Sequence, residues 1–471
     1  MKQALEGACF LIYYPHLCYT LYTRYIIMKL YNTYTNKLEE FKPLHEGIVT
    51  IYSCGPTVYN YIHIGNARPI VFFDTLKKYL EFKGLKVVMA SNFTDLNEKI
   101  LNQSKIEGIS EMEVANKYID AYLENVRKVG ADDSYIKPRV TECIPEIIEF
   151  IQELIDNGSA YESDGDVYFR VSSVKNYGAL SNRKTDELIQ GARVEVSDLK
   201  ESGLDFALWK KFDEGIVYDS PWGKGRPGWH TECCVMINNI FKGLIDIHGG
   251  GSDLVFPHHE NEIAQNEALH HNRLANFWVH NARINFGDEK MSKSLGNVIW
   301  VKDLTCDPRA YRLLVLSYPY RNIISYTDEL QTQFNKEFEK IRQSYTKLFY
   351  FLDINEAFNK DSKTELSESI LAKFIEANEN DMNTPNGITA IYEALKNVNQ
   401  ILRSTKDPQV LSSLYNILTD MLHIYGLDIK LERMDDETRN EYKEWANART
   451  NKDFEKADHY RNVLIEKGIE L

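Results

Sequence analysis

The chain has 471 residues, with 55 Lys and Arg residues against 69 Asp and Glu residues, so its formal net charge is −14. Its length suits two or three domains, and its 43% hydrophobic and 26% charged residues are typical of a globular protein with a full core. The acidic balance argues against nucleic-acid binding driven by overall charge, but not against a local basic face. Seven cysteines without a framework spacing favour a reducing compartment, the cytoplasm, with free thiols or metal ligands.

The start of the chain has an unusual composition. Residues 1–27 are rich in Tyr and lack the apolar core and cleavage site of a signal peptide, and Met28 opens a second plausible start. We expect residues 1–27 to form an extension outside the fold. No later segment reaches the ~20 apolar residues that a membrane span requires, so we expect no membrane contact.

The next segments predict a parallel sheet. VTIYSC (49–54) is a β-rich run, residues 66–84 have apolar side chains near helical spacing with a stop at Gly84, and LKVVMASNFTD (85–95) is a second strand. Strand, helix and strand in this order indicate a βαβ unit, and therefore a parallel sheet.

The rest of the chain predicts an insertion, a return to the sheet and a helical end. Residues 98–157 are helical and charged, 158–227 consist of short strands and turns, and 243–256 is a strand followed by a Gly-rich loop. From about residue 328 onward the sequence is almost wholly helical. The predicted fold is an α/β Rossmann-type domain with a parallel sheet and an insertion, followed by an all-α C-terminal helical bundle. The predicted divisions are the extension (1–27), the Rossmann-type domain (28–328) with an inserted segment (about 120–227), the bundle (329–425) and a small C-terminal region (426–471).

Two short motifs have the composition of phosphate-binding segments. His63-Ile64-Gly65-Asn66 lies between the first strand and its helix, where backbone N–H groups and the positive helix end face an anion. Lys290-Met291-Ser292-Lys293-Ser294 supplies cations and hydroxyl donors on a loop. Each motif alone is more typical of an ordinary turn or a solvated loop. Together, and in this order, they resemble the signature pair of class I aminoacyl-tRNA synthetases.

A pair of residues in FPHHENEIAQ has the spacing of metal ligands. The segment has the composition of a helix, on which residues four apart share a face. This spacing pairs His258 with Glu262, whereas His259 has Ile263 as its partner. The alternative interpretation is that each histidine is an ordinary residue at the start of a helix.

Cysteines elsewhere in the chain are further candidate ligands. Cys54 ends the first strand, and Cys233 and Cys234 lie in GWHTECCVM. Thiolates with an imidazole and a carboxylate favour zinc over magnesium or calcium. Spacing alone does not bring these cysteines to the histidine, and small buried hydrophobic cysteines are the alternative.

These motifs, with further segments, resemble cysteinyl-tRNA synthetases. The chain contains, in the order expected for that family, CGPTVYNYIHIGNARP, DFALWKK, SPWGKGRPGWH, GWHTECCVM, DIHGGGSDLVFPHHENEIAQ and KMSKSLGN. The resemblance covers about residues 29–328 strongly and the helical remainder more weakly. It implies ATP-dependent ligation of L-cysteine to tRNA(Cys) through cysteinyl adenylate, by a monomer whose region 426–471 binds the anticodon.

The resemblance also implies the ligands of one zinc ion per subunit, which match Cys54, Cys233, His258 and Glu262, with Cys234 as a neighbour. Zinc binds the thiol of cysteine as a thiolate, whereas the hydroxyl of serine is a harder and far less acidic ligand. Such a pocket needs no editing domain. Cys54, Thr57 and Trp229 are predicted to line the amino-acid pocket.

The ATP site follows from the same resemblance. His63 and Asn66 are expected to hold the phosphates, and Lys290 and Lys293 to stabilise the charge that develops on pyrophosphate. Mg²⁺ normally accompanies the ATP. The residues expected along the adenosine are Gly249, Gly250 and Asp253.

The sequence departs from the family pattern in three places. Asn66 stands where the first signature usually ends in His, residues 94–99 read TDLNEK where the family has TD-x-DDK, and the chain ends at GIEL. We therefore expect a shortened anticodon region. In that region Arg449, Lys452, Lys456 and His459 recur at steps of 3–4 residues, which predicts a basic stripe for tRNA or, alternatively, a solvated helix face.

Two other functions compete with the synthetase. A zinc-dependent cysteine ligase acting on a small amine, as in mycothiol synthesis, would share the Rossmann-type domain. The helical region from about residue 330 to 471 argues against it, since such an enzyme has no anticodon to reach. A non-catalytic zinc protein that binds RNA would have no need of the two ATP signatures.

Overall fold

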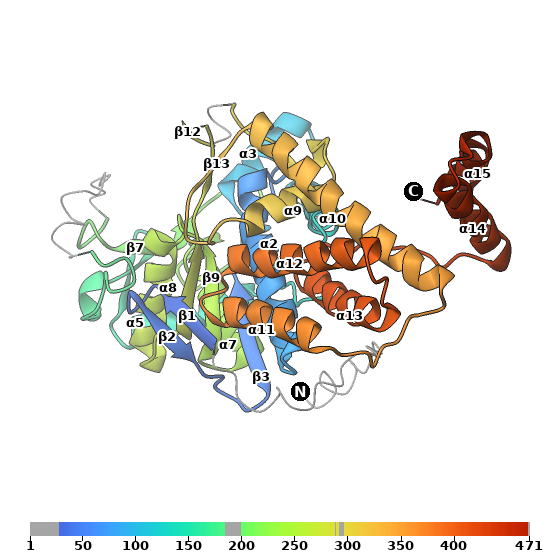
Figure 1. Cartoon of the computed structure of the whole chain (residues 1–471). Helices are drawn as coiled ribbons and strands as arrows, with labels where there is room; N and C mark the ends of the chain where they lie inside the picture. Colours follow the sequence, from blue (N-terminus) through green and yellow to red (C-terminus); the bar gives the residue numbers. More distant parts are fainter. Residues whose placement is uncertain (1–27, 184–198, 288, 292–295, 470–471) are drawn as a thin grey trace.

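A four-stranded parallel sheet forms the centre of the first half of the chain (Figure 1). The computed structural model describes residues 28–183, 199–287, 289–291 and 296–469. The predicted Rossmann-type sheet is confirmed, whereas the predicted extension, residues 1–27, lies outside the described residues. The strands lie in the order β10-β9-β3-β4 and are β3 (Ile48–Ser53), β4 (Lys86–Ala90), β9 (Ile245–Gly251) and β10 (Ala275–Asn281).

The order of the strands places a switch point between β3 and β9. From β3 the chain passes through α2 (Ile64–Phe82) to β4 on one side, and from β9 it passes through α8 (Glu260–His270) to β10 on the other. In open α/β sheets, ligands bind beyond the carboxyl ends of the strands at such a point. A functional site is therefore expected just beyond Ser53 and Gly251.

Helix α2 begins at the first of the two signature motifs. The His63 ring accepts a hydrogen bond from the Asn66 N–H (3.3 Å), and the Asn66 side chain accepts one from the His63 N–H (3.2 Å), which forms a capping box. Beyond its other end, Gly84 has a φ of 86°, a conformation that favours glycine. The predicted helix and its stop are confirmed, although the helix starts two residues earlier, at Ile64.

The segment between β4 and β9 forms helices and a separate antiparallel sheet. The sheet has the order β5-β6-β7-β8, and it confirms the short strands predicted within residues 158–227. Helix α7 (Glu232–Phe241) then returns the chain to β9. The other elements here are α3 (Glu98–Glu107), α4 (Glu111–Lys128), η1 (Val140–Glu142), α5 (Ile144–Asp156), β5 (Ala160–Ser163), β6 (Asp166–Phe169), η2 (Val171–Ser173), β7 (Phe206–Lys211) and β8 (Gly225–Pro227).

Two smaller strand groups flank the parallel sheet. β1 (Met28–Asn32) and β2 (Lys37–Phe41) form an antiparallel hairpin, in a region where we predicted no element. A three-stranded sheet of order β12-β11-β13 follows β10. It contains β11 (Ile284–Phe286), β12 (Glu289–Lys290) and β13 (Ile324–Tyr326), and η5 (Val301–Asp303) and α9 (Pro308–Leu316) lie between β12 and β13.

Helices fill the remainder of the chain, as predicted. Four of them, α10 to α13, share one hydrophobic core with α2 and β3, while the hairpin of α14 and α15 stands apart (Figure 1). No helix in the described part of the chain is long and apolar enough to cross a membrane. The helices are α10 (Asp328–Ile354), α11 (Glu365–Glu379), α12 (Thr384–Arg403), α13 (Pro408–Ile424), α14 (Asp436–Thr450) and α15 (Phe454–Glu466).

Candidate metal centre and active site

The switch point is occupied by Cys54 and the glycine-rich end of β9. The Cys54 N–H donates to the Gly249 carbonyl at 3.0 Å, so the residue after β3 lies directly beside β9. A Cβ added to Gly249 would lie 1.9 Å from the Val279 carbonyl oxygen, and one added to Gly250 would lie 2.9 Å from the Leu254 Cδ1. Glycine at these positions therefore allows the strand end to approach its neighbours closely.

Four side chains from different elements converge around Cys54 Sγ. That sulfur lies 3.5 Å from Cys233 Sγ, 3.5 Å from His258 Nε2 and 3.6 Å from Glu262 Oε1. Cys233 Sγ and His258 Nε2 are 3.7 Å apart, and His258 Nε2 and Glu262 Oε1 are 2.9 Å apart. Tetrahedral zinc with bonds of ~2.0–2.3 Å has ligand-to-ligand distances of ~3.3–3.8 Å. Four of the five distances fit this geometry, and the fifth is that of a direct hydrogen bond.

The local backbone explains how the histidine and the carboxylate meet. His258 lies in η3 (Val255–His259), an irregular turn in which Phe256 is not helical, and Glu262 lies in the first turn of α8. The pairing predicted from spacing is therefore realised, although regular α-helix begins only at Glu260. Cys233 comes from the start of α7, and His258, Cys233 and Glu262 are all buried.

His259 also reaches this cluster, which spacing on an ideal helix did not predict. Its Nε2 lies 3.2 Å from Cys54 Sγ, and its Nδ1 lies 2.8 Å from His280 Nε2. The candidate ligand atoms of Cys54, His258, His259 and Glu262 all lie within 4.8 Å of one another. His259 is thus a second candidate for the fourth ligand beside Cys233. The irregular turn η3 lets both neighbouring histidines face the same centre.

The two cysteines of α7 lie in different surroundings. Cys234 Sγ contacts the Asn266 side-chain oxygen and the Glu262 backbone oxygen, both at 3.8 Å. Cys233 Sγ instead contacts Cys54 and His258. The geometry is therefore consistent with Cys233 as the ligand and Cys234 as a neighbour.

A further buried histidine, which the sequence did not single out, orients Glu262. His248 Nε2 lies 2.6 Å from Glu262 Oε2, and its Nδ1 lies 3.0 Å from the Tyr52 carbonyl oxygen. Hydrogen bonds of this kind fix metal-binding carboxylates and are part of many metal sites. His248 lies on β9, so the only signal in the sequence was its place at the end of a buried strand.

Charge in the cluster favours a cation. A hydrogen bond from the Cys54 thiol outweighs burial and lowers the pKa of Cys233 to about 6, while burial raises the pKa of Cys54 itself. Burial alone would lower the pKa of His258, but Glu262 and Cys233 raise it to about 10. Burial would also raise the pKa of Glu262, yet His248 and His258 hold it well below its usual range. A thiolate and a carboxylate are therefore buried at one point.

Of the two other residues predicted to line the amino-acid pocket, Trp229 contacts a member of this cluster directly and Thr57 does not. The Trp229 ring stacks on the ring of His258, with centroids 4.5 Å apart and planes 23° apart, and remains 40% exposed. Thr57 forms an isolated parallel β-bridge with Thr94. The Thr94 hydroxyl in turn donates to Glu232 Oε2 at 2.8 Å, and Glu232 precedes Cys233 in the sequence. Their contact with substrate stays a prediction.

The TDLNEK segment, which departs from the family pattern, has structural partners. The Asp95 carboxylate accepts hydrogen bonds from the N–H (3.1 Å) and the hydroxyl (2.7 Å) of Thr141. Asn97 caps α3 by accepting from the Lys99 N–H at 3.0 Å. Asp95 and Asn97 therefore have structural roles as hydrogen-bond acceptors within this part of the fold.

The predicted ATP residues are described in part. His63 and Asn66 form the cap of α2, with Asn66 exposed, and Gly249 and Gly250 end β9. Asp253 is exposed in the loop after β9, and a Cβ on Gly251 would lie 2.4 Å from its carboxylate. The side chain of Lys290 and residues 292–295, Lys293 included, lie outside the described residues. The predicted roles of these residues stay predictions.

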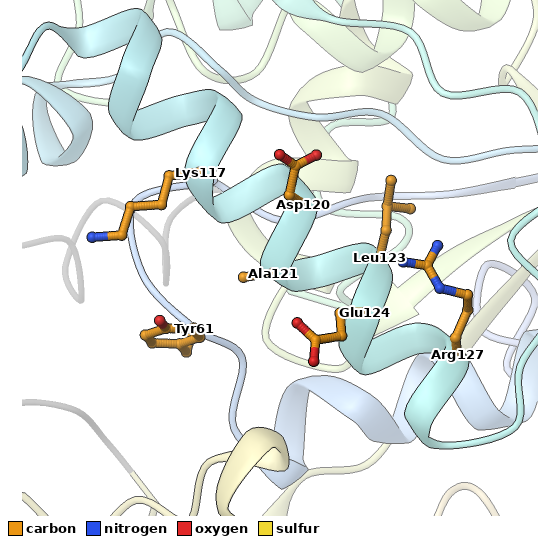
Figure 2. Close-up of a pocket in the computed structure, with 7 residues that line it drawn as sticks. All are labelled: Tyr61, Lys117, Asp120, Ala121, Leu123, Glu124 and Arg127. Carbon is orange, nitrogen blue, oxygen red and sulfur yellow. The ribbon is translucent and has the colours of Figure 1, made fainter.

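A shallow groove of about 600 Å³ lies beside the first signature motif but contains none of the predicted site residues. Figure 2 shows Tyr61 facing one side of α4, and the Lys302 ammonium lies 4.8 Å from the Tyr61 ring centre. Both acidic and basic side chains line the groove, so its charge favours no single ligand. The α4 residues that line it are Lys117, Asp120, Ala121, Leu123, Glu124 and Arg127.

Comparison with known proteins first defines the class. Residues 40–336 match the catalytic domain of the class I (C) tRNA synthetases, and residues 373–430 match the DALR domain. The fold is similar to that of Mycobacterium tuberculosis methionyl-tRNA synthetase in complex with methionyl-adenylate, with a TM-score of 0.56 at 13% identity over 80% of this chain and 89% of that one. The LeuRS of Agrobacterium radiobacter K84 gives a TM-score of 0.57 at 12% identity over 82% and 84%. At such identities the likeness shows the fold alone, that of a class I synthetase.

Closer relatives then define the family. The chain is 44% identical to the cysteine--tRNA ligase of Acholeplasma laidlawii over 446 residues, which cover 94% of this chain and 100% of that one. It is 45% identical to the cysteine--tRNA ligase of Geobacillus thermodenitrificans, over 94% of this chain and 97% of that one. The chain belongs to the cysteine--tRNA ligase family of class I tRNA synthetases.

Proposed function

We propose that this protein joins L-cysteine to tRNA(Cys) at the expense of ATP, through a cysteinyl-adenylate intermediate, and selects cysteine with one bound zinc ion. The observation that carries the proposal is the convergence of Cys54, Cys233, His258 and Glu262 at the switch point of the sheet. Cys54 directly follows β3, and the loop after it leads to the signature motif that starts α2. The amino-acid pocket and the ATP pocket therefore meet at one edge of the sheet.

We favour Cys233 over His259 as the fourth zinc ligand. Zinc binds thiolates well, and the pKa of about 6 makes Cys233 a thiolate at neutral pH. The Nδ1 of His259 faces His280, whose own Nδ1 lies 2.8 Å from the Thr33 hydroxyl. In this chain of hydrogen bonds, His259 is suited to donate from Nε2 to the Cys54 sulfur rather than to bind the metal.

A zinc ion bound here would offer the substrate a site for a thiolate, which serine does not match. Around it, Trp229 covers the ring of His258 and limits access of water to the cluster. No second, editing site is required for this choice of substrate.

The residues of the two signatures would act on ATP. His63, Asn66 and the N-terminus of α2 are suited to hold phosphate, since the helix dipole favours an anion there. Gly249 and Gly250 end β9, where we expect the adenosine to lie, and Asp253 is exposed in the loop that follows. Lys290 and Lys293 would stabilise the charge on the departing pyrophosphate, with Mg²⁺ carried by the ATP.

We further propose that the predicted divisions of the chain hold and that the α14–α15 hairpin contacts tRNA near the anticodon. Arg449, Lys452, Lys456 and His459 are all exposed on this hairpin. The Arg449 guanidinium lies 4.9 Å from the Trp445 ring centre. Proteins that bind single-stranded RNA combine cations with aromatic rings in this way. We expect a cytoplasmic monomer.

The family and the helical domain argue against the two alternatives. A ligase that attaches cysteine to a small amine has no use for a DALR domain, which the chain matches over residues 373–430. A non-catalytic RNA-binding protein would not retain the signature cap at His63 and Asn66 beside a cysteine-lined cluster.

The proposal is tested by cysteine-dependent ATP–pyrophosphate exchange, followed by charging of tRNA(Cys). We expect exchange with cysteine, at least ~10³-fold weaker exchange with serine, and stable charging of the tRNA. Absence of exchange with zinc present, or exchange without charging of any tRNA, would contradict the proposal.

A further inference from the structure

Arg68 is a completely buried arginine in the first part of α2, five residues after the His63 cap. Its Nη1 donates to the carbonyls of Ala282 (2.7 Å) and Arg283 (3.2 Å), and its Nη2 donates to the carbonyl of Pro319 (3.0 Å). Its Nε has no hydrogen-bond partner among the residues that the structure describes. Burying a guanidinium on three neutral carbonyls is costly, which calls for an explanation beyond core packing.

The carbonyls that Arg68 holds lie at the base of the segment that carries the second signature. Ala282 and Arg283 link β10 to β11, which pairs with β12 (Glu289–Lys290), and β12 contains the first residue of that motif. The Ala282 N–H donates to the Tyr320 carbonyl at 2.9 Å, so the residues around Pro319 belong to the same junction. Arg68 therefore fixes the approach to the second signature against the helix of the first.

The segment that follows the second signature is also fixed to the first. The Ile64 N–H donates to the Ile299 carbonyl (2.9 Å), and the Val301 N–H donates to the Ile62 carbonyl (3.0 Å). In addition, the Tyr311 hydroxyl donates to the Ile64 carbonyl at 2.6 Å. The described residues before and after the second signature are thus both anchored near the first, residues 282–283 through Arg68 on α2 and residues 299–301 through Ile62 and Ile64.

We propose that Arg68 is a positioning residue for adenylate formation, which sets the distance between the two ATP signatures without touching ATP. The inference rests on the proposed function and refines its first step. In that step a carboxylate oxygen of cysteine bonds to the α-phosphorus, the bond to the bridging oxygen breaks, and the electron pair leaves with pyrophosphate. Both signatures must contact the phosphates in the same transition state to stabilise that charge. The distance between the two signatures therefore affects the rate of adenylate formation.

The second step places a different demand on the enzyme. The ribose hydroxyl of tRNA attacks the carbonyl carbon of the adenylate, AMP leaves, and no pyrophosphate is present. Misplacing the second signature should therefore slow the first step and spare the second. A loss of stability alone would affect both steps together.

Arg68→Lys keeps a positive charge but loses the forked contact with separate carbonyls. We expect the rate of adenylate formation, measured in a single turnover, to fall ~10–100-fold with the KM for ATP nearly unchanged. Transfer from preformed cysteinyl adenylate to tRNA should stay within about twofold of wild type. Equal slowing of both steps, or no slowing of either in the folded variant, would overturn the proposal.

Two further variants separate positioning from stability. Arg312→Lys alters an equally buried arginine that contacts the middle of α2, so it should lower the melting temperature without changing the ratio of the two steps. Tyr311→Phe removes only the hydroxyl that anchors Ile64, and it tests the other anchor at the first signature if Arg68→Lys does not fold. It should slow the first step more than the second, and equal slowing of both would count against the proposal. If wild type lacks cysteine-dependent exchange, the proposed function itself fails.

Discussion

Cys54 and Cys233 hold their sulfur atoms 3.5 Å apart, and their thiols ionise very differently in the metal-free protein. Burial raises the pKa of Cys54, whereas the hydrogen bond from Cys54 lowers the pKa of Cys233 to about 6. The pKa of His258 is raised to about 10, mainly by Glu262 acting against burial. Near neutral pH the cluster therefore contains a thiol, a thiolate, an imidazolium and a carboxylate.

Zinc binding must displace the protons that remain on its ligands. At about pH 7.5 we expect release of about two protons per zinc ion, one from Cys54 and one from His258. Affinity should rise with pH, and below pH ~6 a third proton, from Cys233, should be released as well. Calorimetric titration in buffers of different ionisation enthalpy measures this number. Cys234→Ser should leave it unchanged, and zinc binding without proton release would contradict the assignment.

At the scale of elements, a buried ion pair joins α2 to α9, and its arginine also contacts the end of α13. Arg312, on α9, contacts the Asp74 carboxylate and the carbonyls of Tyr425 and Val129. Burial alone would raise the pKa of Asp74, but Arg312 and the Lys78 ammonium, 3.0 Å away, hold it below its usual value. Asp74 therefore contributes stability above about pH 4, which is lost as pH falls through its lowered pKa.

Arg312→Met would leave the Asp74 charge buried with Lys78 and the Asp132 N–H as its remaining partners. We expect the free energy of unfolding to fall by ~3–5 kcal/mol at pH 7, because removing one partner of a buried pair leaves an uncompensated charge. The deficit should shrink as pH is lowered and Asp74 takes up a proton. Chemical denaturation at several pH values tests this. The double variant with Asp74→Asn should cost less than the sum of the two single changes, and simple additivity would argue against the pair.

The individual strands and helices show which features the sequence patterns predict and which they miss. Alternation and helical spacing gave β3, α2 and β4 because each element encodes its own periodicity. They also gave the pair His258 and Glu262, which lie one turn apart. His259 was missed because it lies in an irregular turn, and His248 because it reaches Glu262 from a neighbouring strand. Contacts between elements distant in sequence leave no periodic signal, so the cysteines were placed only by resemblance.

At the scale of the whole molecule, the helical bundle shares a core with the catalytic domain, while the α14–α15 hairpin joins the end of α10 through a small contact. The rings of Tyr350 and Tyr442 lie 5.9 Å apart there, and the Met434 N–H donates to Asp353 at 2.9 Å. This arrangement extends the hairpin, which exposes the cations Arg449, Lys452 and Lys456 among its acidic residues, away from the helical bundle (Figure 1). The net charge of −14 makes such a local surface the expected place for RNA contact.

Replacing Arg449 and Lys456 together with Ala should weaken tRNA binding without affecting amino-acid activation. We expect the KM for tRNA to rise roughly tenfold and the salt dependence of binding to decrease, since two phosphate contacts would be lost. Cysteine-dependent pyrophosphate exchange should be unchanged. Lys396→Ala, an exposed lysine on α12, is the matched control and should behave as wild type. Unchanged charging kinetics in the double variant would show that the hairpin is an ordinary solvated surface.

The most direct test of the zinc-selected cysteine pocket compares Cys233→Ser with His259→Gln by elemental analysis and by exchange with cysteine and serine. We predict that Cys233→Ser loses stoichiometric zinc and most of its preference for cysteine, while His259→Gln and the control Cys234→Ser keep one zinc ion per chain. If Cys233→Ser retains its zinc and His259→Gln does not, the ligands are Cys54, His258, His259 and Glu262, and the proposed pocket is wrong.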